Sequence, residues 1–184
     1  HLAKELNVGR HIVRLALERL DLEGLVTIQP NRGAVVTRLE LDDAVDILYA
    51  REALEGAAAR LAAQRIDAAG LDALGALVRE MEQCLAAGDF DDYSATNGRF
   101  HQVIYDASGS RQIPSLLATL RARLVRFQFR TVLIPGRAEQ SMAEHRRIYE
   151  ALRARDADAS EQAMRAHIAN LRETLTKAWE LVRT

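Results

Sequence analysis

The sequence predicts a mainly α-helical protein, in which a short N-terminal segment of two helices and a hairpin is followed by an antiparallel bundle of six helices. The composition predicts helix, because aromatic residues make up only 5% of the 184 residues and three prolines interrupt the chain. A hydrophobic content of 48% supplies a buried core. From residue 42 onward, the apolar residues recur at helical spacing without any strand pattern.

The first 38 residues predict two helices, a tight turn and a hairpin. Residues 1–6 are expected to end one helix, and residues 9–23 to form a second helix that ends at Gly24, a residue suited to a left-handed cap. Residues 25–37 hold two β-branched runs around a Pro-Asn-Arg-Gly turn, which predicts a hairpin. In the second helix, an apolar stripe is expected to pack inward and to leave the basic first turn exposed; it consists of Val13, Ala16, Leu17 and Leu20.

This segment also carries a basic excess that the net charge of the whole chain does not reveal. The formal net charge is -1, but residues 1–38 hold six basic and four acidic side chains, a net of +2, so that the remainder carries -3. A DNA-recognition helix needs cationic side chains near its first turn, and a wing needs Gly and Arg that approach the DNA backbone. Arg10, His11 and Arg14 begin such a turn. The alternative is that these are ordinary solvated charges on a small appendage.

The segment resembles the winged helix of the GntR family of bacterial transcription regulators. The matching strings include Val8-Gly9-Arg10, Val13-Arg14, Glu23-Gly24-Leu25-Val26 and Pro30-Asn31-Arg32-Gly33. The resemblance implies a winged helix-turn-helix DNA-binding domain over 1–38 whose first helix lies upstream of His1. Gly9 stands where the family usually has Ser, and Ile12 where it often has Pro. The residues expected to bind DNA are Gly9, Arg10, His11, Arg14, Asn31, Arg32 and Gly33.

Residues 42–184 predict six helices. Breaks divide this part of the chain into six segments, and Ser, Asp or Asn near most of them can cap the next helix. These breaks lie near Ile66-Asp67, Gly88-Asp89, Ser108-Gly109-Ser110, Pro135-Gly136 and Asp156-Ala157-Asp158.

Three histidines in the bundle are candidate metal ligands. His101, His145 and His167 fall on three different helices, each on an apolar stripe, and Asn97 stands one turn before His101. An i, i+4 pair from one helix and one His from each of two others can converge on a zinc, nickel, iron or manganese ion. The alternative is that each is a core histidine bonded to a backbone carbonyl.

Residues 42–180 resemble the FCD domain that commonly follows a GntR-type winged helix, in its six-helix, VanR-like form. The strings that carry the resemblance are Arg51-Glu52-Ala53-Leu54-Glu55, Asn97-Gly98-Arg99-Phe100-His101, Glu144-His145-Arg146-Arg147-Ile148 and Arg165-Ala166-His167. The resemblance implies an effector-binding domain with a metal site formed by Asn97, His101, His145 and His167. Asn97 replaces the Asp of many relatives.

A metal ion held by neutral ligands keeps its +2 charge, so we expect an anionic effector, a small carboxylate metabolite. Arg51 and Arg130 are candidate effector-binding residues because a guanidinium matches carboxylate geometry. The alternative is that each arginine covers the bundle surface with its aliphatic stem. Arg121, Arg123, Arg126 and Arg130 together suggest the solvated side of one helix.

We therefore expect a ligand-responsive transcription regulator, not an enzyme, that binds double-stranded operator DNA as a homodimer. No apolar run approaches the length of a membrane span, and no signal peptide is evident, so we expect a cytoplasmic protein. Two alternatives use the same three-histidine site: a metal-dependent enzyme and a metal sensor. The enzyme lacks an obvious general base, because Glu144 adjoins His145 and points in a different direction.

Overall fold

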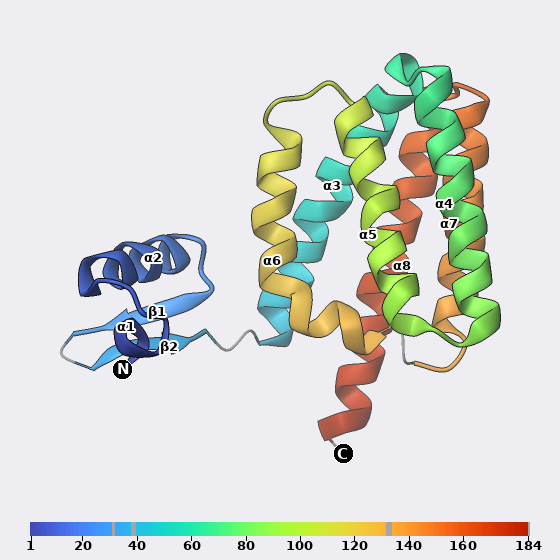
Figure 1. Ribbon diagram of the computed structural model, residues 1–184. Helices are drawn as coiled ribbons and strands as arrows, with labels where there is room; N and C mark the ends of the chain where they lie inside the picture. Colours follow the sequence, from blue (N-terminus) through green and yellow to red (C-terminus); the bar gives the residue numbers. More distant parts are fainter. Residues whose placement is uncertain (31, 38–39, 132–133, 184) are drawn as a thin grey trace. The chain divides into compact units, whose positions relative to one another are not determined.

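The computed structural model describes residues 1–30, 32–37, 40–131 and 134–183, and the description excludes the side chains of residues 125–131 and 180–183. The described residues form eight helices and one two-stranded sheet (Figure 1). The chain divides into two compact units, unit 1 over His1–Glu40 and unit 2 over Leu41–Thr184. The prediction of a mainly α-helical fold with a small hairpin is confirmed.

Unit 1 consists of two helices and a hairpin. Its elements are α1 (Leu2–Glu5), α2 (Arg10–Leu22), β1 (Val26–Gln29) and β2 (Gly33–Val36). The strands are antiparallel, with Val26 opposite Val36 and Gln29 opposite Gly33. Gly24 and Gly33 have φ values of 72° and 89°, the left-handed region in which a Cβ atom is strained. The backbone N–H of Ile28 donates to Asp21 Oδ1 at 2.9 Å, which ties the hairpin to the end of α2.

None of the described side chains of unit 1 is buried. Val13, Leu17 and Leu20 are half-buried, as their stripe predicts, but Ala16 is exposed because it lies at the edge of that stripe and its methyl group is short. Leu6 and Ile12 are 64% and 55% exposed. Unit 1 therefore has an apolar surface as well as its basic one.

Unit 2 is a bundle of six helices, which Figure 1 shows side by side. α3 packs along α8, α4 packs against α5 and α7, and α7 packs against α8. Among the described residues, no helix is long and apolar enough to cross a membrane. The six helices are α3 (Leu41–Arg65), α4 (Ala68–Ala87), α5 (Phe90–Ala107), α6 (Ile113–Thr131), α7 (Arg137–Arg153) and α8 (Ala157–Arg183).

Short polar side chains cap the helices at their first turns. Asp67 accepts from the Gly70 amide, and Asp89 accepts from the Asp92 amide, at 2.8 and 3.0 Å. Each bond satisfies an amide that the first turn of a helix leaves without a partner. Gly88 ends α4 with a φ of 71°.

The bundle core places the histidine faces inward. Phe100, Ile148 and Ile168 are each 0% exposed, and each such side chain contributes roughly 1.5–3 kcal/mol through burial. Because the histidines share helix faces with these residues, packing the apolar stripes carries the imidazoles into the interior. The core thus positions the site.

Candidate metal centre

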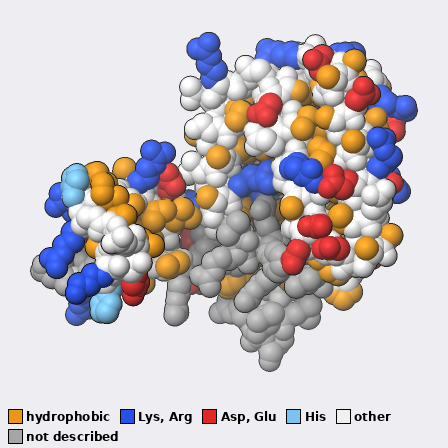
Figure 2. All heavy atoms as spheres, in the orientation of Figure 1, with side chains coloured by type: hydrophobic (Ala, Val, Ile, Leu, Met, Phe, Trp, Pro, Cys, Tyr) orange, Lys and Arg blue, Asp and Glu red, His pale blue; other side chains and the backbone are white. Residues whose placement is uncertain are grey.

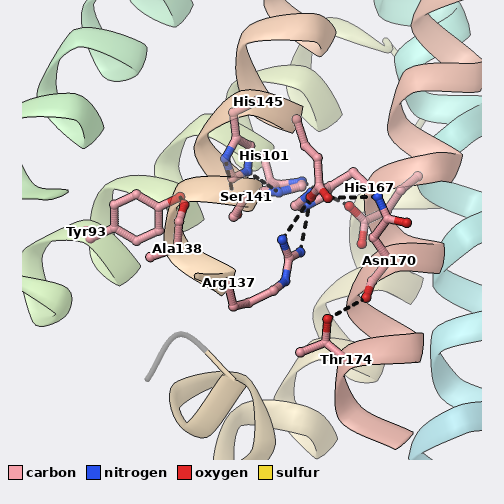
Figure 3. Close-up of polar contacts among 11 residues, drawn as sticks. Tyr93, His101, Arg137, Ala138, Ser141, His145, His167, Asn170 and Thr174 are labelled. Atoms are coloured by element: carbon pink, nitrogen blue, oxygen red, sulfur yellow. Dashed lines mark hydrogen bonds and ion pairs between the residues drawn. The ribbon is translucent and has the colours of Figure 1, made fainter. Parts of the chain in front are cut away.

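Three imidazoles from three helices meet inside unit 2. His101 on α5, His145 on α7 and His167 on α8 are all buried, and one ligating nitrogen from each lies within 4.8 Å of the others. Figure 3 shows the three rings close together. Nε2 of His145 is 3.4 Å from Nε2 of His101. Two nitrogens that each bind one ion at about 2.1 Å with a tetrahedral angle are about 3.4 Å apart, so this pair fits a shared metal ion.

The other ring nitrogen of each histidine faces a polar group. His167 Nδ1 lies 2.7 Å from Glu144 Oε2 in a hydrogen bond, and His145 Nδ1 lies 3.5 Å from the Ser141 hydroxyl. His101 Nδ1 lies 3.0 Å from Glu55 Oε2. This distance suits a hydrogen bond, but the angle does not. In each ring, Nε2 is left for an ion.

Two buried arginines balance the two carboxylates. Arg51 lies 2.7 Å from Glu55, and Arg137 reaches Glu144 Oε2 at 3.1 Å through both Nη1 and Nη2. Burial alone would raise the pKa of Glu55, but Arg51 and His101 hold it well below its usual range. Burial likewise opposes a lowered pKa of Glu144, and the hydrogen bond from His167 and the charge of Arg137 outweigh it. Both carboxylates are therefore ionised at neutral pH.

Burial keeps His101 and His145 neutral. It lowers the pKa of His101 from 6.5 to about 4, although Glu55 opposes this shift. Burial also lowers the pKa of His145 well below 6.5, and the neighbouring His167 acts in the same direction. A neutral imidazole carries the lone pair that a metal requires.

A cavity of about 80 Å³ adjoins the histidines, and its lining includes Arg51, Asn97 and Arg121. Asn97 Oδ1 and Arg51 Nη1 are buried and have no hydrogen-bond partner among the described residues. Leaving a buried polar atom without a partner costs about 1–3 kcal/mol. The unpaired acceptor of Asn97 suits a cation, and the unpaired donor of Arg51 in the same cavity suits an anion.

The arginines singled out from the sequence differ in where the structure places them. Arg51 is 2% exposed and lines the cavity, so it does not lie on the bundle surface. The side chain of Arg130 lies outside the described residues. The expectation that Arg121 belongs to a solvated face is wrong: it is half-buried, lines the cavity and donates to the Tyr105 hydroxyl at 3.3 Å. The reason is helix geometry, because Arg121 lies one turn from each of the buried residues Leu117 and Leu124 on α6.

Sequence reasoning missed Glu55, Arg137 and Ser141, and it considered Glu144 only as a poor general-base candidate for the enzyme alternative. Glu55 had a usable signal, since it falls at helical spacing on the same face as the buried Leu48, Arg51 and Ala59 of α3. Glu144 had a similar signal, since it lies one turn before the buried Ile148 on α7, but its partner His167 lies on another helix.

The residues expected to bind DNA are on the surface of unit 1. Gly9, Arg10, His11, Arg14, Arg32 and Gly33 are all exposed, and Asn31 lies outside the described residues. Figure 2 shows Lys and Arg side chains on the surface of this unit. The Arg14 side chain is 70% exposed, and its Nε lies 3.7 Å from Glu18 Oε1. This distance is too long for a hydrogen bond, so the guanidinium stays accessible.

A helix pair with a hairpin and exposed basic residues, joined to a helical bundle with a buried polar cavity, defines a two-domain transcription regulator. Residues 1–36 match the family of bacterial regulatory proteins named gntR, and residues 46–170 match the FCD domain. The chain belongs to the GntR family of transcription regulators and carries an FCD domain, so it is not an enzyme.

Curated relatives and a solved structure agree with this family. The chain is 27% identical to the HTH-type transcriptional repressor RspR of Escherichia coli over 92% of this chain and 74% of that protein. It is 29% identical to the HTH-type transcriptional regulator YdhC of Bacillus subtilis over 90% of this chain and 75% of that protein. The structure of E. coli McbR/YncC has the same fold, with a TM-score of 0.83, 21% identity, and coverage of 97% and 85%.

Proposed function

We propose that this regulator binds operator DNA as a homodimer, and that a small carboxylate held at a divalent metal centre controls its DNA affinity. The proposed metal ligands are Asn97, His101, His145 and His167, and zinc, nickel, iron and manganese are the candidate ions. One observation carries the proposal: three imidazoles converge beside a cavity that contains a guanidinium nitrogen of Arg51 with no partner among the described residues.

Charge supports an anionic effector. Arg51 balances Glu55 and Arg137 balances Glu144, so these four buried side chains add no net charge. The Asn97 amide is neutral, and so are the buried imidazoles of His101 and His145. An ion would bring +2 into a buried site, and a carboxylate in an open coordination position would reduce that charge.

The volume of the cavity and the Arg51 donor support a small effector with a polar group. A volume of about 80 Å³ holds a few water-sized groups, which suits a short-chain carboxylate. Arg51 Nη1 supplies a donor for an oxygen of the effector. Arg130, whose side chain lies outside the described residues, is a second proposed contact.

Helix α3 provides a route from the cavity to the DNA-binding unit. Arg51 and Glu55 both lie on α3, which begins at Leu41, directly after unit 1 ends at Glu40. Arg51 is ten residues into the helix, which is about 15 Å along its axis. Effector contact at Arg51 would therefore bias the same rigid element that is joined to unit 1.

The DNA contacts are proposed to come from the first turn of α2 and from the hairpin. Arg10, His11 and Arg14 are exposed on α2, and Arg32 and Gly33 are exposed in the hairpin. Gly9 precedes α2, and a methyl group added at its Cα would have no other atom within 4 Å, so the DNA backbone can approach it closely. Asn31 completes the proposed set.

The first experiment measures metal content by elemental analysis of the full-length protein purified without added metal. We expect one transition metal per chain, lost in His101→Ala and His145→Ala. The exposed His11→Ala variant is the control and should retain the metal. A parent protein without metal after reconstitution would overturn the metal centre.

The second experiment titrates short carboxylates into the metal-loaded protein bound to promoter DNA, with fluorescence anisotropy as the readout. At least one carboxylate should change the DNA affinity tenfold or more, and its neutral amide should not. Arg51→Lys should lose this response because an ammonium lacks the planar fork, whereas Arg60→Lys, partly exposed on the same helix, should keep it. If chelation alone changed DNA affinity and no carboxylate did, the protein would be a metal sensor.

A further inference from the structure

Glu144 lies within a buried network that joins two of the three histidine-bearing helices. It is on α7, directly before His145, and its side chain is 5% exposed. Its Oε2 contacts His167 Nδ1 at 2.7 Å and its Oε1 accepts from Asn170 Nδ2 at 2.8 Å, both on α8. Arg137 approaches Oε2 at 3.1 Å through two nitrogens. Each oxygen of this carboxylate therefore has a partner.

The network fixes which nitrogen of His167 carries the proton. An ionised carboxylate only accepts hydrogen bonds, so the contact with Glu144 requires N–H at Nδ1 and, in the neutral ring, leaves the lone pair on Nε2. Arg137 and Asn170 hold Glu144 at two further points and restrict its rotation. The His167 ring is thereby oriented before any ion arrives.

We propose that Glu144, anchored by Arg137 and Asn170, is a positioning residue that holds His167 Nε2 ready for the metal ion. This inference rests on the metal centre proposed above. One turn of α7 then supplies both a ligand, His145, and the acceptor that orients the ligand of α8. Because Asn97 gives the site a neutral oxygen in place of a carboxylate, the extra basicity that Glu144 lends to His167 strengthens a weak donor set.

The contact between Glu55 and His101 has the same chemistry with poorer geometry. Glu55 approaches His101 Nδ1 at 3.0 Å without the angle of a hydrogen bond. The contribution of Glu55 to metal binding is accordingly smaller than that of Glu144. This ranking gives the experiment an internal comparison.

The test measures Co²⁺ affinity and the visible spectrum of bound Co²⁺ in the full-length protein and three variants. Glu144→Gln should bind Co²⁺ about 10- to 100-fold more weakly than the parent, with a shifted spectrum, because the amide is a weaker acceptor and can turn its NH₂ toward His167. Glu55→Gln should show a smaller loss. Glu52→Gln is the matched control: it lies on α3 in ion pairs with Arg165 and Arg172, so it should bind within threefold of the parent.

A second readout needs no metal. Long-range ¹⁵N–¹H NMR of the metal-free parent should show His167 protonated at Nδ1, and Glu144→Gln should alter that tautomer. A parent with the proton on Nε2, or a Glu144→Gln variant whose Co²⁺ affinity stays within threefold, would overturn the positioning role. A parent with the Nδ1 tautomer that takes up no Co²⁺ would instead overturn the metal centre of the proposed function, and with it the role of Glu144 in metal binding.

Discussion

Arg51 and Glu55 form an ion pair at 2.7 Å within a single helix, and their side chains are only 2% and 0% exposed. Removing two charges from water is costly, and a pair at this depth is stable only while both partners remain. Two nitrogens of the Arg51 guanidinium, Nε and Nη2, contact Glu55 Oε1, and the third, Nη1, has no partner among the described residues and lies beside the cavity. The same side chain thus balances the charge of a buried carboxylate and offers a donor to a ligand.

Arg51→Met should destabilise the protein by about 3–5 kcal/mol, because it leaves the Glu55 carboxylate buried without its cation. The double variant Arg51→Met with Glu55→Leu should recover much of this loss. Urea denaturation of the metal-free protein gives the free energy of unfolding. Arg153→Met, which breaks an exposed pair with Glu150, should change it by less than about 1 kcal/mol. Equal losses in the buried and the exposed variant would contradict this account.

The metal-free protein should lose stability as the pH falls from 6.5 toward 4. The folded pKa of His101 is about 4 and its ordinary value is 6.5, so the unfolded chain binds the proton first. The stabilisation is complete above pH 6.5 and is lost on acidification, by about 3 kcal/mol for a gap of this size. His145 acts in the same direction. The depressed pKa of Glu55 removes further stability below about pH 4.5.

Denaturation at pH 7.5, 6.5, 5.5 and 4.5 checks this dependence. His101→Gln should flatten the slope, whereas His11→Gln, on the exposed face of α2, should leave it unchanged. A metal-free parent whose unfolding free energy is constant from pH 7.5 to 4.5 would show that the histidines are not buried in neutral form.

Arg14→Ala and Arg32→Ala should each weaken operator binding. If both arginines contact phosphates, each substitution removes one counterion-releasing contact and lowers the salt slope of log K by about 1. Anisotropy titrations at several salt concentrations measure that slope. Arg153→Ala, an exposed arginine of unit 2, should leave both quantities unchanged. Parent-like slopes in both unit 1 variants would place the DNA contacts elsewhere.

Two glycine substitutions should act with opposite signs. Gly88 has a φ of 71° and open space around a would-be Cβ, so Gly88→Ala costs only backbone strain, about 1 kcal/mol. Gly98 lies inside α5, where a Cβ would make one ordinary contact at 3.6 Å with Arg121, so Gly98→Ala should stabilise by about 0.4–1 kcal/mol. Thermal unfolding of both variants gives the comparison, and a shift of the same sign in both would be inconsistent with it.

The periodicity of the sequence predicted most of the helices of the fold. Apolar spacing around His101, His145 and His167 identified the inward face of three helices, because the hydrophobic effect buries a helix by its stripe. The spacing could not show that these three faces meet, because that depends on how α5, α7 and α8 pack. For this reason, the convergence of the imidazoles became visible only in three dimensions.

Charged residues were harder to place than apolar ones. The sequence pattern placed Arg121 on a solvated face and gave Glu144 no buried partner, since a lone charge is costly to bury. Their partners, Tyr105 for Arg121 and His167 for Glu144, are on other helices. A local pattern in sequence cannot reveal a partner that is distant along the chain, so such networks escape prediction from one sequence.

Helix α3 carries Arg51 at the cavity and is joined at its first residue to the DNA-binding unit. Linkage makes any coupling through it reciprocal: if a ligand in the cavity changes operator affinity by some factor, operator DNA changes the affinity for that ligand by the same factor. The promoter would then act as an effector of the sensing domain, and a DNA-bound regulator and a free one would report different concentrations of the same metabolite.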